Sequence, residues 1–167
     1  GKIRIWEVLP SGEEKILHNG HWEETAEDST ETRGFFIEDD GGFQKPMEYW
    51  IGAMVFTPDA KMLITGSRDN TIRFFEMPTM NELRVVRGHN GWVRSLVVSP
   101  DGKVLISAGD DNTIRFWDIA TGRNFRTDKT HGGAVRGIAL SPDGLRLASA
   151  SWDRTVKLWE GGVEPAE

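Results

Sequence analysis

The chain contains no cysteine in its 167 residues. Disulfides, cysteine nucleophiles and thiolate metal sites are therefore excluded, and the composition favours a reducing compartment. We accordingly expect an intracellular protein, either cytoplasmic or nuclear. Long apolar runs are also missing, because no stretch of the sequence approaches the roughly 20 residues that a membrane-spanning helix needs.

Clusters of basic residues are absent as well. The net charge is -6, and it is unevenly distributed. Residues 21–49 hold nine acids and two bases, a charge of -7, so the rest of the chain sums to +1. A nearly neutral body without grouped Lys or Arg does not favour nucleic-acid binding, which depends on a basic surface.

What the sequence does contain is an internal repeat with a period of about 42 residues. The motif Ser-Pro-Asp-Gly occupies residues 99–102 and 141–144, and the related Thr-Pro-Asp-Ala occupies residues 57–60. A fixed phase over three copies indicates repeated structural units. The same spacing separates the members of two further sets: Asp69, Asp111 and Asp153, and Phe75, Trp117 and Trp159.

Each copy is predicted to form four short strands. In the middle copy the apolar run 93–98 ends at a Pro-Asp-Gly turn, and residues 104–107 follow it. Residues 113–119 alternate polar and apolar side chains, as half-buried strands do, and residues 123–127 form the fourth strand. An antiparallel sheet of this size has open edges and needs neighbours to cover its faces, so such units form arrays.

The spacing from Gly88-His89 to Trp117-Asp118 resembles the Gly-His to Trp-Asp frame of the WD-repeat (WD40-type) β-propellers. The resemblance covers residues 2–19 and 49–160. It implies an all-β fold, a ring of four-stranded antiparallel blades whose strands are lettered a to d from the inside outwards. This chain then holds about three blades' worth of an incomplete ring.

The resemblance divides the chain into six consecutive segments. They are the end of a preceding blade (1–19, strands c and d), an acidic insertion in the d–a loop (20–49), two complete blades (50–88 and 89–130), a blade without its outer strand (131–160) and a tail (161–167). Because the chain opens inside a strand, we expect a piece of a longer propeller. The alternative is that several copies assemble into one ring.

Two copies share a set of Ser, His, Asp and Trp that suggests an acyl-transfer triad. A triad repeated in each blade is the wrong pattern for a single active site. In the resembling family these residues form a buried hydrogen-bond network, and we predict that structural role here, with no enzyme activity, cofactor or metal site. The two sets are His89, Ser107, Asp111 and Trp117, and His131, Ser149, Asp153 and Trp159.

The copy that begins at Trp50 departs from this pattern. Met47 stands where His is expected, and Phe75 stands where Trp is expected, although Asp69 is retained. We predict that this blade lacks the network, relies on apolar packing and is the weakest of the three.

The family resemblance also implies that the d–a and b–c loops share one face, the top face, where partners of WD-repeat proteins often bind. Two positions per blade look out from it: Trp50, Trp92 and Ala134 before strand a, and Arg68, Asp110 and Trp152 before the turn Asp. Trp and Arg are enriched in binding hot spots. We predict partner binding through all of these except Ala134, and the alternative is that the Trp rings pack on neighbouring loops.

The interval from Trp6 to Phe75 exceeds the repeat period by 27 positions, and this excess falls in the d–a loop. A loop of that length is either functional or disordered. Its acidic part, residues 23–32, is predicted to be mobile, and the apolar residues of 34–43 are predicted to dock on the propeller or on a partner. If the insertion contributes to binding, the partner is expected to be basic. An inert variable loop is the alternative.

Together these features predict a non-enzymatic scaffold that binds a protein or peptide on its top face within a multiprotein complex. The alternative is a sensor or regulatory propeller segment of a larger multidomain enzyme or switch protein. In both cases the remaining blades come from the rest of the chain or from another copy. Neither membrane nor nucleic acid is expected as a partner.

Overall fold

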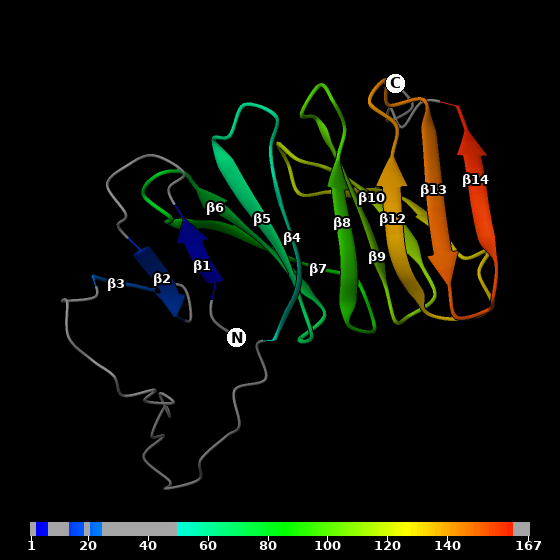
Figure 1. Cartoon of the computed structure of the whole chain (residues 1–167), viewed down its shortest axis with the longest axis horizontal. Helices are drawn as coiled ribbons and strands as arrows, with labels where there is room; N and C mark the ends of the chain where they lie inside the picture. The colour runs from blue at the N-terminus through cyan, green and yellow to red at the C-terminus, as the bar shows by residue number, and fades with distance from the viewer. Residues whose placement is uncertain (1–2, 7–13, 19–20, 25–49, 162–167) are drawn as a thin grey trace, which may run out of the picture. The chain divides into compact units, whose positions relative to one another are not determined.

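The computed structural model describes residues 3–6, 14–18, 21–24 and 50–161, with side chains described for 50–161. Within these residues the chain forms strands joined by turns and contains no helix. The strands make four separate antiparallel sheets (Figure 1). The predicted all-β propeller fold of antiparallel blades is thereby confirmed. The chain divides into two compact units, residues 1–50 and 51–167.

The first unit contains a three-stranded sheet, in the order β1 (Ile3–Trp6), β2 (Glu14–His18) and β3 (His21–Glu24). The strand β3 corrects one prediction, because its residues Glu23 and Glu24 were expected to belong to the mobile acidic part, residues 23–32, of the insertion. His18 lies opposite His21, so only Asn19-Gly20 stands between β2 and β3 in the sequence. Asn-Gly is the pair that most favours a two-residue hairpin connection, and this local signal outweighs the acidic composition. The predictions for residues 25–49 lie outside the described residues.

The second unit contains three sheets, which we name by their strands. The β4–β7 blade consists of β4 (Ile51–Phe56), β5 (Met62–Ser67), β6 (Thr71–Glu76) and β7 (Glu82–Arg87). The β8–β11 blade consists of β8 (Val93–Val98), β9 (Val104–Gly109), β10 (Ile114–Asp118) and β11 (Asn124–Asp128). The β12–β14 blade has three strands, β12 (Val135–Leu140), β13 (Arg146–Ser151) and β14 (Val156–Glu160).

Each blade is a simple meander in which consecutive strands pair. The three sheets stand side by side, and the first strands β4, β8 and β12 are neighbours (Figure 1). The turns between the first two strands close as the sequence predicts. In the middle blade Gly102 N–H donates to Ser99 O at 2.9 Å, with Gly102 at φ 74°. A positive φ of this kind costs glycine little.

The hydrophobic core lies between the sheets, in two clusters. Strand β9 is buried along its whole length because it contributes to both. Leu105 packs with Phe74 and Trp117 against the β4–β7 blade. Ile106 on the opposite face of β9 packs with Val135 of the β12–β14 blade. Successive side chains of a strand point to opposite faces, so β9 packs against the β4–β7 blade on one face and against the β12–β14 blade on the other.

Candidate functional site

In the β8–β11 blade, His89 joins the loop before β8 to strands β9 and β10. His89 Nε2 lies 2.7 Å from Ser107 Oγ, and His89 Nδ1 lies 2.9 Å from Asp111 Oδ2. The indole N–H of Trp117 donates to the same Ser107 oxygen at 2.8 Å. The Asn90 backbone N–H donates to Asp111 at 2.9 Å. The four predicted side chains are thus brought together in one continuous chain of hydrogen bonds.

One histidine tautomer satisfies every member of this chain. The Trp117 N–H donates to Ser107, the Ser107 hydroxyl donates to His89 Nε2, and the proton on His89 Nδ1 goes to the Asp111 carboxylate. Burial acts to raise the pKa of Asp111. The interactions with His89, Asn90 and Thr113 together outweigh burial and hold the pKa of this carboxyl well below its usual range.

The hydrogen bonds follow the same order as in a Ser-His-Asp triad, but the serine hydroxyl is not accessible as that of a triad must be. Ser107 has 0% of its surface exposed, and its oxygen also accepts from the buried Trp117. A nucleophile has to reach its substrate, and this hydroxyl cannot. The arrangement therefore supports a structural role for the network.

The same chain of bonds recurs in the β12–β14 blade. His131 lies 2.7 Å from both Asp153 Oδ2 and Ser149 Oγ, and the Trp159 N–H donates to Ser149 at 3.0 Å. Trp159 is only half-buried, whereas its counterpart Trp117 is fully buried.

The β4–β7 blade differs. Its turn acid Asp69 accepts from the Thr71 hydroxyl at 2.6 Å and from Arg73 at 3.1 Å. Phe75 fills the position of the network Trp and is buried. Met47, which stands in place of the histidine, lies outside the described residues. The prediction that this blade is the weakest stays a prediction.

The lowered pKa of Asp111 predicts how its contribution depends on pH. A carboxyl whose pKa is lower in the folded state stabilises the fold above its unfolded pKa of about 4, and loses that effect as the pH falls below it. The difference in unfolding free energy between the wild type and Asp111→Asn should therefore be largest at neutral pH and should shrink below about pH 4. Urea titrations at several pH values measure it. A difference that stays constant from pH 7 to pH 3 would contradict the assignment.

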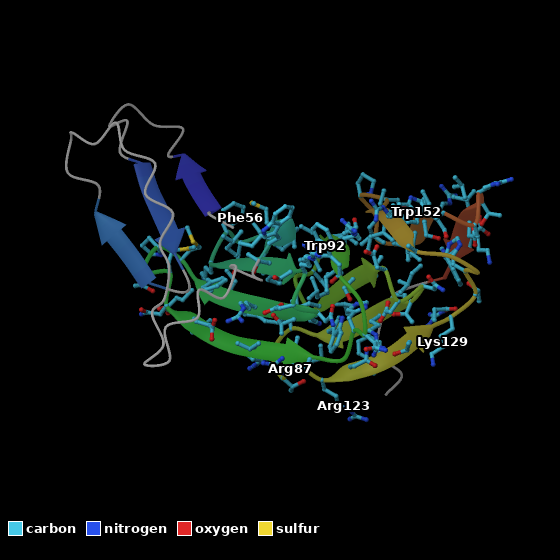
Figure 2. The ribbon with its side chains drawn as sticks, turned by 90° about the horizontal axis from the view of Figure 1, so that it is seen from below. Phe56, Arg87, Trp92, Arg123, Lys129 and Trp152 are labelled. Carbon is cyan, nitrogen blue, oxygen red and sulfur yellow. The ribbon has the colours of Figure 1, made fainter. Side chains whose placement is uncertain are left out.

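The top face is the end of the sheets formed by loops 88–92 and 129–134 and by turns 68–70, 110–112 and 152–154. The arrows of β8 and β12 point away from this end in Figure 1. Figure 2 views the molecule from below and shows Trp92 and Trp152 on neighbouring blades. Backbone bonds tie the loops to the turns, since Asp110 N–H donates to Trp92 O and Trp152 N–H donates to Ala134 O, both at 2.9 Å.

Each first strand carries an irregularity in its register next to this face. The shift lies between Val93 and Ser95 in β8, and equivalent shifts lie around Gly52 in β4 and Arg136 in β12. An extra residue at such a bulge is turned out of the regular alternation of the strand. The bulge residues are Gly52, Arg94 and Arg136, which are again spaced by one repeat period.

The two bulge arginines connect three of the predicted top-face residues, Trp92, Asp110 and Trp152, into one row. The Arg94 guanidinium stacks 3.4 Å from the Trp92 ring centroid and binds Asp110 through two nitrogens, at 2.7 and 2.9 Å. Arg136 binds the same Asp110 at 3.1 Å and lies 4.3 Å from the Trp152 ring centroid. Charge-assisted and cation–π contacts of this kind hold planar groups in fixed orientations.

The row extends towards the β4–β7 blade, where Arg68 lies 5.7 Å from the Trp92 ring centroid. It thus crosses three blades in the order Arg68, Trp92, Arg94, Asp110, Arg136 and Trp152. We call these six residues the top-face row. Arg94 and Arg136 were not predicted from the sequence, although their spacing by one repeat period was a usable signal.

The predicted residues differ in accessibility. Trp152 is 68% exposed and Trp50 is 55% exposed. Trp92 is half-buried, because its ring lies between the Arg94 guanidinium and the backbone of Gly52. From the sequence, the alternative to partner binding was that the Trp rings pack on neighbouring loops. Trp92 does pack on a neighbouring element, because its ring lies against Gly52 of strand β4. Ala134 is buried.

We predict that Gly52 is essential for the packing of the Trp92 ring. A Cβ at this position would overlap the Trp92 indole nitrogen and would lie 2.7 Å from the Val93 carbonyl oxygen, a backbone atom that cannot give way cheaply. We expect Gly52→Ala to lower the melting temperature and to shift the tryptophan fluorescence. Gly137→Ala is a matched control, because nothing described lies within 4 Å of its Cβ position. Equal effects of the two substitutions would contradict this account.

The residues that the structure describes contain no group of three His, Asp or Glu side chains arranged to hold a metal ion. Among the same residues there is no helix long and apolar enough to cross a membrane.

Comparison with known proteins adds the family. The chain is similar to two solved structures described as "Structure of U3-55K" and "Crystal structure of RRP9 WD40 repeats". Each is 28% identical to it with a TM-score of 0.65. The match covers 70% of this chain and 37% of each of those chains, so the chain spans just over a third of their length. The family profile described as "WD domain, G-beta repeat" matches residues 45–76, 80–118 and 122–160. The predicted resemblance is therefore confirmed, and the chain belongs to the WD-repeat family.

Proposed function

We propose that this chain is part of a non-enzymatic interaction scaffold whose top-face row binds a protein or peptide partner within a multiprotein complex. WD-repeat domains are typically protein-interaction scaffolds, and fold alone does not identify the partner or the site. The choice of the top face rests on the residues described above. An intracellular location remains part of the proposal.

The observation that carries the proposal is the exposed indole of Trp152. A large apolar ring that is 68% exposed is costly to leave in water, yet it is held in place by Arg136. Anchors that are rigid before binding lose little conformational freedom when a partner arrives. Trp and Arg are also the residue types that contribute most at interfaces.

Affinity capture with the full-length protein tests the proposal. Trp152→Ala and Arg136→Gln are expected to deplete the same captured proteins, as measured by quantitative mass spectrometry. Leu145→Ala is the control, because Leu145 is 55% exposed but lies in the turn before β13, at the opposite end of the blade. An unchanged capture profile for the Trp152 variant, or an equal loss for the Leu145 variant, would contradict the proposed site.

A further inference from the structure

We propose that the top face of the β8–β11 and β12–β14 blades selects an acidic peptide, whose carboxylates pair with Arg136 and Arg154 and whose apolar side chain contacts Trp152. This inference rests on the proposed function and adds the chemistry of the partner. It depends on which charged side chains of this face are paired within the fold and which are exposed to solvent.

The acids of this face have their oxygens occupied within the fold. Asp111 and Asp153 accept from their histidines and from threonine hydroxyls. Asp110 accepts from both Arg94 and Arg136, with Arg94 the largest cause of its lowered pKa. Asp110 is thus paired with two guanidinium groups, and the ionised side chains of Asp111 and Asp153 expose only 7% and 16% of their surface, so little carboxylate surface is open to a partner.

The cations have donors left over. Arg136 uses only Nη1 on Asp110, and its side chain is 35% exposed. A guanidinium has five N–H donors, so its remaining edge can bind a carboxylate while the stack on Trp152 is kept. Arg154 is exposed, and among the described residues it has no ion-pair partner. The face thus offers one guanidinium stacked on Trp152 and a second, exposed one in the same turn as Trp152.

The backbone of Arg154 supports a role for its side chain. Arg154 has φ 67° in the turn after β13, where the other two blades place Asn70 at φ 68° and Asn112 at φ 64°. Asn tolerates this left-handed conformation better than Arg does. The β12–β14 blade therefore has a less favourable residue at this turn position. This residue places a cation two positions after Trp152 in the sequence.

The arrangement favours a short segment that combines acids with an apolar side chain. Trp152 has the Arg136 guanidinium over its ring, 4.3 Å from the centroid, and most of its surface remains open. Arg136 is held by both this stack and Asp110, so it is preorganised for a carboxylate. The sequence-based expectation of a basic partner depended on the acidic residues 21–49, most of which lie outside the described residues. A basic partner is accordingly one of the outcomes of the test.

The test measures fluorescence anisotropy of three labelled probes with the full chain. The probes are a peptide with two Glu on each side of a Phe, the same peptide with Lys in place of Glu, and a single-stranded RNA of similar length. We expect the Glu peptide alone to bind, and to weaken several-fold between 50 and 300 mM salt because charge pairs at a surface are screened. Arg136→Gln combined with Arg154→Asn should weaken it about tenfold at an unchanged melting temperature. Arg123→Gln, in the turn between β10 and β11 (Figure 2), should have no effect.

Three results would overturn the inference: no binding of the Glu peptide at 1 mM, tighter binding of the Lys peptide or of RNA, or Glu-peptide binding that does not depend on Arg136 and Arg154. Failure of this inference can be separated from failure of the proposed function. If the Glu peptide does not bind but affinity capture still requires Trp152, only the acidic chemistry is wrong. If capture does not require Trp152, the top-face site itself is wrong.

Discussion

Replacement of Ser107 by alanine is expected to lower the free energy of unfolding by about 2–4 kcal/mol. The hydroxyl is fully buried and serves two neighbours at once, because it accepts from Trp117 at 2.8 Å and pairs with His89 at 2.7 Å. Its loss leaves two buried polar nitrogens without partners, and each costs roughly 1–3 kcal/mol. Equilibrium denaturation in urea, followed by circular dichroism, measures the change.

Ser149→Ala provides a matched comparison in the next blade. The same bonds are lost there, but Trp159 is half-buried and can exchange its lost partner for water. We expect the loss for Ser149→Ala to be distinctly smaller than that for Ser107→Ala. Unchanged or increased stability of the Ser107 variant would overturn the structural assignment.

Replacement of Trp152 by alanine is expected to weaken the complex with a captured partner by about 30-fold or more. A hot-spot tryptophan contributes at least about 2 kcal/mol when truncated, and Trp152 is the most exposed aromatic ring of the top-face row. Because the ring is exposed, its removal should leave the melting temperature within about 2 °C of the wild type. Isothermal titration calorimetry with the purified partner, together with thermal unfolding of both proteins, measures the two effects.

Trp92 is expected to behave differently, although the sequence places it in the same class. Its ring packs on Gly52 and under Arg94, so Trp92→Ala should reduce stability and binding together. Comparison of the two variants thus distinguishes a residue that contacts the partner, Trp152, from a residue that supports the structure of the top face, Trp92. If Trp152→Ala destabilises the fold as much as Trp92→Ala does, then Trp152 is a packing residue and the assignment of the site fails.

The repeat made the fold predictable from the sequence. Anchors such as Asp111 and Trp117 recur in one phase, and the turns and alternating strands between them are local features that need no knowledge of distant contacts. The acidic composition of residues 21–49 does not predict the strand β3, whereas the Asn19-Gly20 pair is a local signal for it. A short-range turn signal therefore deserved more weight than the acidity of the residues that follow it.

The top-face row was only partly predictable, for a physical reason. Its members meet across blades, and the side chains of Arg94 and Arg136 reach the face because each stands at a bulge in its strand. A pattern of alternating polar and apolar residues assumes a regular strand and assigns such residues to the wrong side. The packing of Trp92 depends on Gly52, which lies much earlier in the chain and in another sheet. A local sequence pattern does not reveal such a contact.

Hydrogen–deuterium exchange of the full-length protein, with and without its captured partner, tests the central claim most directly. Binding is expected to protect the backbone amides of residues 88–92, 110–112 and 152–154, which belong to the top face. No change is expected in the turns at residues 99–102 and 141–144 at the opposite end of the same blades. Protection of those opposite turns with an unprotected top face would show that the partner binds elsewhere, and the account would be wrong.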